Sequence, residues 1–592
     1  MKPLVALVLL LAAADAVAAG GKLAGSKHDL SVTGPGPIRA VSERNPCVFC
    51  HVPHNGSNNR PDVVALHRPY ESTTMSARPG SPNGATRVCL SCHDGTIAVG
   101  QTRARRIETT VATIGAERAS NLGTDLRRTH PVSFTPVPGS GTHAPAPGDA
   151  VKLDAGRQVQ CTSCHDPHEE YRDPRVGKFL VKPSERSALC LTCHDAVAVQ
   201  RPGASHAEST AHYGPAEGNT AGWGSVADAG CMACHASHGA DPKGQLVARP
   251  LADDDALCLR CHATSVVRRP LAADLAKPSA HAGAERGVHD AGEGRPGAAR
   301  PLPERSPGTT RHVTCVDCHD PHAASGQPAV GTSPGGALAG VWGIDRNGAR
   351  VAQIRSEYEL CFKCHADSAN KPQSGGPRPP DLVRRAVVDV NLREVFGPTA
   401  VSSHPVLGPG RNPDVPSLRA PWTAASTVAC GDCHASDTGP GAGGSGARGP
   451  HGSIYPPLLE RAYSTSDATV ESPAAYALCY KCHDRAVLLS TRSSFAEHAR
   501  HLGPTVNAPC SACHAAHGIS ATAGTPDGNA HLVSFDLAIV RASAGGPAQY
   551  RSLGRAQGSC TLSCHGTDHR ASTYGGIVPA GFRRGAALRR AR

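Results

Sequence analysis

Apolar residues form one long uninterrupted run in this chain, at its start. The run extends from Leu4 to Ala14, follows Lys2 and precedes the small residues at 16–19. A positive start, a short apolar segment and small residues are typical of an export signal, so we expect residues 1–19 to be a cleaved signal peptide. The run is too short to span a bilayer, and no later stretch is apolar enough to do so.

The rest of the chain predicts few long regular elements. Hydrophobic residues make up 39% of the 592 residues and aromatic residues only 4%, while 64 glycines and 50 prolines interrupt the sequence. Glycine and proline at this density break helices and strands. We therefore expect a mostly coil fold with short α-helices at the motifs described next, and few or no strands.

Pairs of cysteines followed by histidine recur along the whole sequence, as in CTSCH at residues 161–165. One helical turn places both sulfurs on one face, where they can add to the two vinyl groups of one porphyrin. The histidine then points at the iron, and this spacing is the attachment signature of c-type haem. Eleven copies have two residues between the cysteines, and the last copy has three.

Numbered 1 to 12 in chain order, the motifs have the cysteine pairs Cys47 and Cys50, Cys89 and Cys92, Cys161 and Cys164, Cys190 and Cys193, Cys231 and Cys234, Cys258 and Cys261, Cys315 and Cys318, Cys361 and Cys364, Cys430 and Cys433, Cys479 and Cys482, Cys510 and Cys513, and Cys560 and Cys564. The histidines that follow them are His51, His93, His165, His194, His235, His262, His319, His365, His434, His483, His514 and His565.

Zinc ribbons and disulfides are the alternative uses of paired cysteines. Neither requires a histidine after every second cysteine. The twelve pairs account for all 24 cysteines, so none is left over. We predict haem c as the cofactor, about twelve groups covalently attached, with the porphyrins forming most of the buried apolar core.

The sixth ligand of each iron is predicted to be histidine. Only Met1, Met75 and Met232 are methionines, whereas 32 histidines leave 20 outside the motifs. Several of these histidines occupy regular positions, three residues after a motif histidine or upstream of a motif pair. The plus-three candidates are His54, His168, His238, His322 and His517, and the upstream candidates are His28, His130, His212, His289, His404 and His498.

The chain thus consists of six similar units, each with an upstream histidine and two motifs. A plus-three histidine is close to its own motif histidine, so we expect it to serve a different, adjacent iron. The fifth unit has no plus-three histidine after His434, and His451 is the candidate substitute. For the upstream position, His206, His281, His312 and His501 are close competitors of the predicted residues.

The predicted domains are dihaem units that share haem contacts rather than fold independently. Residues 271–311 and about 366–385 are rich in small residues and proline and are interpreted as flexible connectors. The units span residues 20–115, 116–200, 201–270, 271–385, 386–490 and 491–592, the last with a basic tail.

The formal charge of +11 does not indicate a nucleic-acid partner. Each haem brings two propionates, and twelve haems make the reduced holoprotein strongly negative. Much of the arginine is therefore interpreted as partners for propionates, whose carboxylates fit the guanidinium fork.

The sequence resembles bacterial multihaem cytochromes c built from doubled CXXCH motifs. The segments CVFCHVPHN (47–55) and CLSCHDGT (89–96) resemble the opening pair of that family, and HLVSFD (531–536) and SCTLSCHG (559–566) its closing segment. The resemblance implies bis-histidine ligation, low reduction potentials and electron transfer in anaerobic respiration.

We therefore expect an exported electron carrier, periplasmic or extracellular and outer-membrane associated. Its partners would be other redox proteins or an extracellular acceptor, with an outer-membrane porin or a homo-oligomeric filament as alternative assemblies. The alternative function is that of an enzyme that reduces nitrite or another small oxyanion at one open haem. All twelve motifs end in histidine, without the lysine familiar in such reductases, which favours the carrier.

Overall fold

The structure is a computed structural model that describes most of the chain. The described residues are 23–51, 65–72, 75–138, 141–195, 203–240, 246–248, 255–281, 313–367, 383–389 and 391–575. The predicted signal peptide and the basic tail lie outside them, as do His54, His289 and His312.

The chain forms two compact units, Met1–Ala252 and Asp253–Arg592. The division falls inside the third predicted repeat, between motifs 5 and 6. Motifs 1–5 therefore belong to the first unit and motifs 6–12 to the second.

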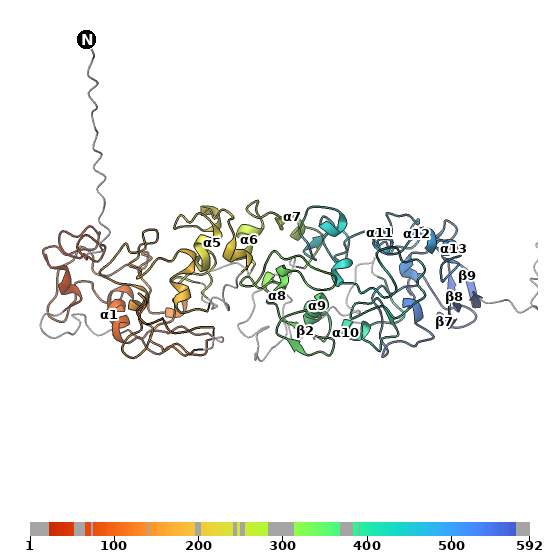
Figure 1. Ribbon diagram of the computed structural model, residues 1–592, viewed down its shortest axis with the longest axis horizontal. Helices are drawn as coiled ribbons and strands as arrows, with labels where there is room; N and C mark the ends of the chain where they lie inside the picture. The colour runs from red at the N-terminus through yellow and green to blue at the C-terminus, as the bar shows by residue number, and fades with distance from the viewer. Residues whose placement is uncertain are drawn as a thin grey trace, which may run out of the picture. The chain divides into compact units, whose positions relative to one another are not determined.

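The first unit is built from short helical segments joined by coil (Figure 1). Its longest described helix, α1, has ten residues. The segments are η1 (Pro46–Phe49), α1 (Gly84–His93), η2 (Leu126–Arg128), α2 (Cys161–Cys164), η3 (Glu185–Ser187), η4 (Cys190–Thr192), α4 (Ser205–Glu208), η5 (Pro215–Glu217), α5 (Val226–Ala229) and η6 (Gly230–Ala233), where η denotes a 3-10 helix.

The helices of the second unit are also short and joined by coil. They are α6 (Ala256–His262), α7 (Ala272–Leu275), α8 (Cys315–Cys318), η7 (Gly336–Leu338), α9 (Glu357–His365), α10 (Leu392–Val395), η8 (Cys430–Asp432), η9 (Pro440–Ala442), α11 (Ala477–Tyr480), α12 (Arg485–Leu488), α13 (His498–Leu502), η10 (Cys510–Ala512) and η11 (Ala530–Leu532). No helix among the described residues is long and apolar enough to cross a membrane.

The described strands all lie in the second unit, and most have only two residues. Antiparallel pairs join β1 (Ser279–Ala280) to β5 (Gly452–Ser453), β2 (Gly343–Ile344) to β3 (Arg350–Val351), and β4 (Ser402–Ser403) to β6 (Gly518–Ile519). The exception is an antiparallel three-stranded sheet of β7 (Gln549–Gly554), β8 (Gln557–Cys564) and β9 (Thr567–Tyr574). The mostly coil fold is thus confirmed, with this sheet as an addition.

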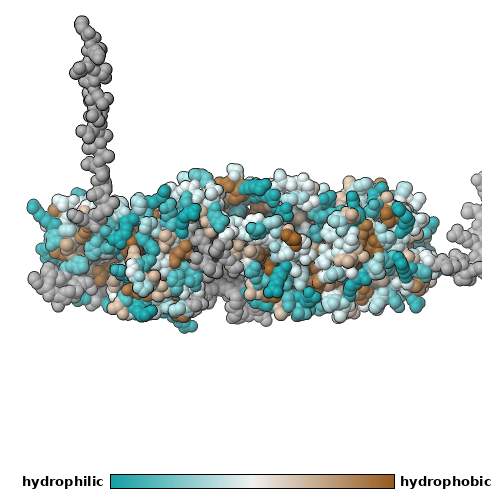
Figure 2. Space-filling view, in the orientation of Figure 1, coloured by the Kyte–Doolittle hydropathy of each residue, from teal (hydrophilic) through white to brown (hydrophobic). Residues whose placement is uncertain are grey.

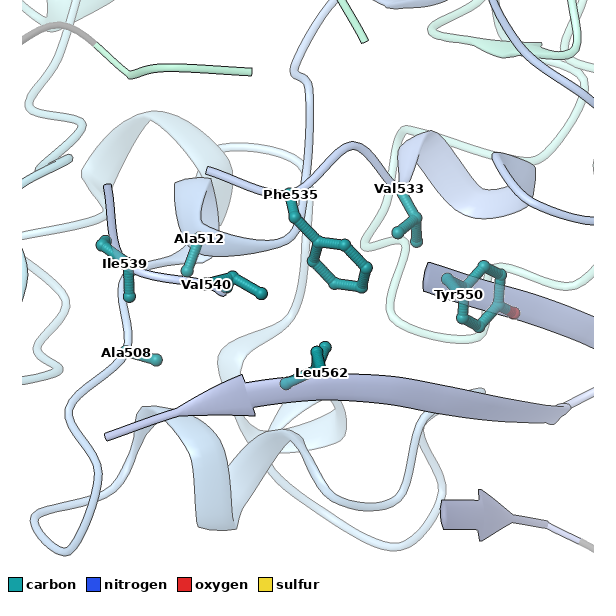
Figure 3. Packing of buried hydrophobic residues seen from close by; sticks show 8 residues of the cluster. All are labelled: Ala508, Ala512, Val533, Phe535, Ile539, Val540, Tyr550 and Leu562. Carbon is teal, nitrogen blue, oxygen red and sulfur yellow. The ribbon is translucent and has the colours of Figure 1, made fainter. Parts of the chain in front are cut away.

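Buried apolar residues gather in small clusters rather than in one large core. The cluster around Phe535 takes Leu562 from β8 and Tyr550 from β7 (Figure 3). A second cluster forms around Phe362 of α9, and smaller ones surround Phe49 and Trp223. Over the face seen in Figure 2, apolar residues are scattered among polar ones.

Candidate haem sites and axial histidines

The eleven strict motifs all lie on a helical turn. The turn closes because the N–H of the motif histidine donates to the carbonyl of the first cysteine, four residues back. In motif 3 this bond joins His165 to Cys161 at 3.0 Å, and in motif 7 it joins His319 to Cys315 at 2.9 Å. The short helices expected at these motifs are therefore present, and each turn presents both thiols and the imidazole from one short segment.

A polar side chain inside several motifs fixes the start of the turn. Asp317 accepts the N–H of Thr314 at 2.8 Å, and Asp432 accepts that of Ala429 at 2.8 Å. Satisfying these N–H groups, which lack partners within the helix, stabilises a helix start. The residues between the cysteines therefore help to form the turn.

Histidine rings face one another in pairs, each at nearly the same separation. An iron held by two imidazoles has each nitrogen about 2 Å away, which puts the ring centres about 6 Å apart. The observed centroid separations range from 5.8 Å for His434 and His517 to 6.3 Å for His130 and His194. The geometry fits one metal between two axial imidazoles.

Four such pairs lie in the first unit: His28–His93, His51–His168, His130–His194 and His165–His238. Five lie in the second unit: His281–His365, His319–His451, His434–His517, His498–His514 and His501–His569.

Hydrogen bonds determine which ring nitrogen is available to a metal. The Nδ1 atoms of His93, His165 and His319 lie 2.7, 2.8 and 2.8 Å from backbone carbonyl oxygens. A carbonyl only accepts, so Nδ1 carries the proton and Nε2 keeps its lone pair for a metal. The same contact of Nδ1 with a backbone carbonyl places the proton on Nδ1 in His28, His130, His281, His404, His434, His501 and His514.

Burial keeps many of these rings neutral. It lowers the pKa of His130 to about 4 and that of His517 to about 3, with further lowering from neighbouring histidines. A neutral imidazole has the lone pair that a metal needs, so the surroundings prepare these side chains for ligation.

The plus-three histidines face the motif histidine of an earlier repeat. His168, after motif 3, faces His51 of motif 1, and His238, after motif 5, faces His165 of motif 3. His517, after motif 11, faces His434 of motif 9. Each of these contacts ties one repeat to the one before it.

The upstream histidines face a motif histidine of their own repeat. His28 faces His93 of motif 2, His130 faces His194 of motif 4, and His498 faces His514 of motif 11. His404 lowers the pKa of His483, although burial is the larger cause.

Three predicted ligands need separate mention. In the fourth repeat the ring that faces His365 is His281, the competitor of the predicted His289. His212 forms an isolated backbone bridge with Ser225. The Nδ1 of His322 lies 3.7 Å from the Asp320 carboxylate.

The fifth repeat replaces its missing plus-three histidine by a residue further along the chain. The rings of His451 and His319 are 6.1 Å apart and almost parallel, at 9°. The plus-three position holds Asp437, whose carboxylate binds the Lys277 ammonium at 2.8 Å. His451 thus faces the motif of the preceding repeat, as the plus-three histidines of other repeats do.

Thiols of consecutive motifs are neighbours within each unit. In the first unit the thiols of Cys89 and Cys161 are hydrogen-bonded, which raises the pKa of Cys89. Burial raises the pKa of Cys164 to about 12, and the charge of Cys193 adds to the effect. Hydrogen bonds between thiols also connect motifs 4 and 5 (Cys190 and Cys231), 6 and 7 (Cys258 and Cys315), 8 and 9 (Cys361 and Cys430) and 10 and 11 (Cys479 and Cys510).

The second cysteines of motifs 2, 5, 6 and 8 are Cys92, Cys234, Cys261 and Cys364, and each lies in the helical turn of its motif or at the end of that turn. The carbonyl of Cys92 accepts a hydrogen bond from the N–H of Gly95 at 3.1 Å, and the carbonyl of Cys261 accepts one from the N–H of Thr264 at 3.0 Å. The motif 5 residue is exposed, and the other three are half-buried. Haem attachment at these four cysteines is a prediction, as it is at the cysteines of the other motifs.

The remaining consecutive motifs are connected by the electrostatic effect of one thiol on the pKa of another. Cys50 raises the pKa of Cys89, Cys361 raises that of Cys318, and Cys482 raises that of Cys433. Cys513 of motif 11 packs against the same apolar cluster as Cys560 and Cys564 of motif 12. Motifs 1 to 5 of the first unit, and motifs 6 to 12 of the second, therefore form two series in chain order.

Motif 12 departs from the helical turn of the others. Cys560 and Cys564 lie on strand β8, and His565 occupies the turn to β9 with a φ of 48°. The Nε2 of His565 lies 2.9 Å from the Asp467 carboxylate. The expectation of a helix at every motif is thus wrong for this one, because residues 557–564 pair on both sides with other strands.

The comparisons with known proteins agree with the motif chemistry. Residues 155–199 and 224–266 match the family model described as the doubled CXXCH motif. No curated protein matches the chain. The paired motifs indicate covalently bound haem c and support a multihaem c-type cytochrome family, whose members act in electron transfer.

Proposed function

We propose that this protein is an electron-transfer cytochrome whose haems form a series of bis-histidine sites within each of its two units. The observation that carries the proposal is the neighbouring arrangement of consecutive motifs, since thiols of one motif contact thiols of the next. Haems attached through such thiols are close together. Electron tunnelling falls steeply with distance, so closeness favours transfer along the series.

The facing imidazoles support transfer rather than catalysis. An iron with two imidazoles has no open position for a substrate, whereas a reductase needs one. The nine ring pairs provide such closed positions, and their carbonyl-bound Nδ1 atoms hold the rings in place. When bound, haem would supply a one-electron redox centre at each site.

The proposed setting is anaerobic respiration outside the cytoplasm, with about twelve haems on each chain. The apolar run at Leu4–Ala14 supports export, and the twelve cysteine pairs support the haem count. The proposed partners are redox proteins or an extracellular acceptor. A porin partner and a filament of identical copies are both compatible with this setting.

The experiment combines a haem count with a test for open iron positions. The intact mass of the purified holoprotein is expected to show about twelve covalent haems, and the reduced protein is expected to bind no carbon monoxide. In a reductive titration of the oxidised protein, every haem should become reduced. Tight carbon monoxide binding together with turnover of nitrite or hydroxylamine would contradict the carrier and favour the reductase.

A further inference from the structure

Among the described residues of the second unit, one histidine pair contains no motif histidine. The rings of His501 and His569 have centroids 6.2 Å apart and planes inclined by 30°. Each of the other eight pairs includes the histidine that directly follows a cysteine pair. The separation nevertheless equals that of those pairs, so the same two-imidazole ligation of a metal fits here.

His501 has the second contact that is typical of the other ligand candidates. Its Nδ1 lies 2.9 Å from the carbonyl oxygen of Glu497, so Nδ1 carries the proton and Nε2 is left to a metal. Phe495 packs against His501 at 5.5 Å and against Tyr574 at 4.7 Å, which restricts the ring. The imidazole is thus oriented before any group binds.

His569 lies beside the cysteines of motif 12. On β9 it pairs directly with Leu562 of β8. Side chains that oppose one another across two strands share a face of the sheet. Cys564 lies two residues after Leu562 on the same face of β8, whereas the pairing with β9 shifts register between Cys560 and Leu562. Cys560 and Cys564 both pack against the apolar cluster that contains Leu562.

His565 is directed elsewhere. It occupies the two-residue turn with Gly566, and both residues have positive φ, 48° and 72°. This is the turn that favours a tight antiparallel hairpin. The Nε2 of His565, the nitrogen that other motifs leave for a metal, lies 2.9 Å from the Asp467 carboxylate.

We propose that the iron of the twelfth haem is ligated by His569 and His501, and that His565 is not a ligand. The haem is attached at Cys560 and Cys564, and the neighbouring strand supplies the histidine that the helical turn supplies in motifs 1 to 11. This assignment rests on the proposed function. It places the last haem beside motif 11, because Cys513 packs against the same cluster as Cys560 and Cys564.

Histidine variants of the full-length holoprotein test the assignment. His569→Ala and His501→Ala are each expected to open one iron, seen as one high-spin haem and one bound carbon monoxide per chain. His565→Ala is expected to leave all irons low-spin. His143→Ala is a matched control, because His143 is a partly exposed histidine bound to Asp195.

Two further measurements keep the test decisive. Added imidazole should restore the low-spin spectrum of His569→Ala, which separates a missing ligand from a damaged fold, and intact mass should show twelve haems in the wild-type protein. An open iron in His565→Ala but not in His569→Ala would overturn the assignment, as would a mass with eleven haems. Failure of the proposed function itself would differ, because the wild-type protein would then bind carbon monoxide or lack haem at motifs 1 to 11.

Discussion

Single histidines link consecutive repeats through residues that are far apart in the sequence, and His168 is the clearest case. Its ring faces that of His51 at 6.1 Å with planes inclined by 17°. His168→Ala should therefore leave the haem of motif 1, and not that of motif 3, with an open position. We expect one high-spin haem per chain and unchanged covalent haem content, measured by magnetic circular dichroism and intact mass.

The control for this change is again His143→Ala, which should leave the spectrum unchanged. To identify the affected haem, His168→Ala can be combined with Cys47→Ser and Cys50→Ser, which prevent attachment at motif 1. The high-spin signal should then disappear. A signal that persists in the combined variant would contradict the pairing of His168 with His51.

A buried carboxylate shapes the loop after motif 3. Asp173 accepts hydrogen bonds from the N–H of Arg175, from the N–H of Val176, and from both the N–H and the hydroxyl of Ser184. Burial raises its pKa, but these bonds outweigh burial, so the pKa is lowered from its ordinary value of 3.8. Asp173→Asn should reduce the free energy of unfolding by about 1–3 kcal/mol at neutral pH.

The pH dependence of that loss has a definite sign. A carboxyl with a lowered pKa in the folded state stabilises the protein above its unfolded pKa, and this contribution disappears as the pH falls through the folded pKa. The difference between wild type and Asp173→Asn in chemical unfolding should therefore be full at pH 6 and shrink below about pH 4. An equal difference at pH 6 and pH 3 would be inconsistent with an ionised Asp173.

The sequence predicts the helical turns of the eleven strict motifs, and it predicts the histidines that face them only in part. The cysteines and motif histidines follow from local spacing, because one helical turn contains all of them. Distal histidines come from other repeats, so spacing alone does not distinguish His281 from His289. The candidate His451 came from counting, since it is a spare histidine in a repeat without a plus-three residue.

Between elements, lysines inside two motifs connect the two motifs of one repeat. Lys363 of α9 donates to the carbonyl of Asp317 in motif 7, and Lys481 of motif 10 donates to that of Asp432 in motif 9 at 2.6 Å. Both lysines directly precede the second cysteine. Their surroundings differ, because Lys481 also binds the buried Glu460 at 2.7 Å, whereas Lys363 lies 4.5 Å from the Trp342 ring centre.

Removing one partner of the Glu460–Lys481 pair should cost more than removing both. Lys481→Met leaves a buried carboxylate with a weakened set of partners, and we expect a loss of about 2–4 kcal/mol in the free energy of unfolding. The double variant Lys481→Met with Glu460→Met should recover part of that loss. Denaturant unfolding of both variants checks this, and additive losses would contradict a coupled pair.

The helical elements were easier to predict than the sheet. Each motif turn has a local cause in the bond from the histidine N–H to the first cysteine carbonyl. Strand β8 instead forms hairpins with the segments directly before and after it, since Tyr550 and Ser572 are the pairing partners of Cys560. The extra residue between the cysteines was the signal in the sequence that motif 12 differs.

For each unit as a whole, apolar clusters supply little of the stability. The described clusters contain eight, seven, three and three buried residues, small for chains of this length. Hydrophobic stabilisation scales with buried apolar area, so porphyrin faces would have to supply the rest. A chain produced without haem should therefore be largely unfolded, with rapid amide hydrogen exchange throughout, and a protected haem-free chain would contradict this.

The backward reach of the plus-three histidines has a consequence for how the protein is made. Synthesis proceeds from the N-terminus, so His51 is made well before His168, and His165 before His238. The residue that would complete the first site of such a repeat is therefore available only once the next repeat has been made. Maturation would then proceed in chain order, with each such repeat supplying the histidine that completes a site in the repeat before it. A chain that stops midway would have its one incomplete site in the repeat made last, where quality-control proteases or oxidants would find it.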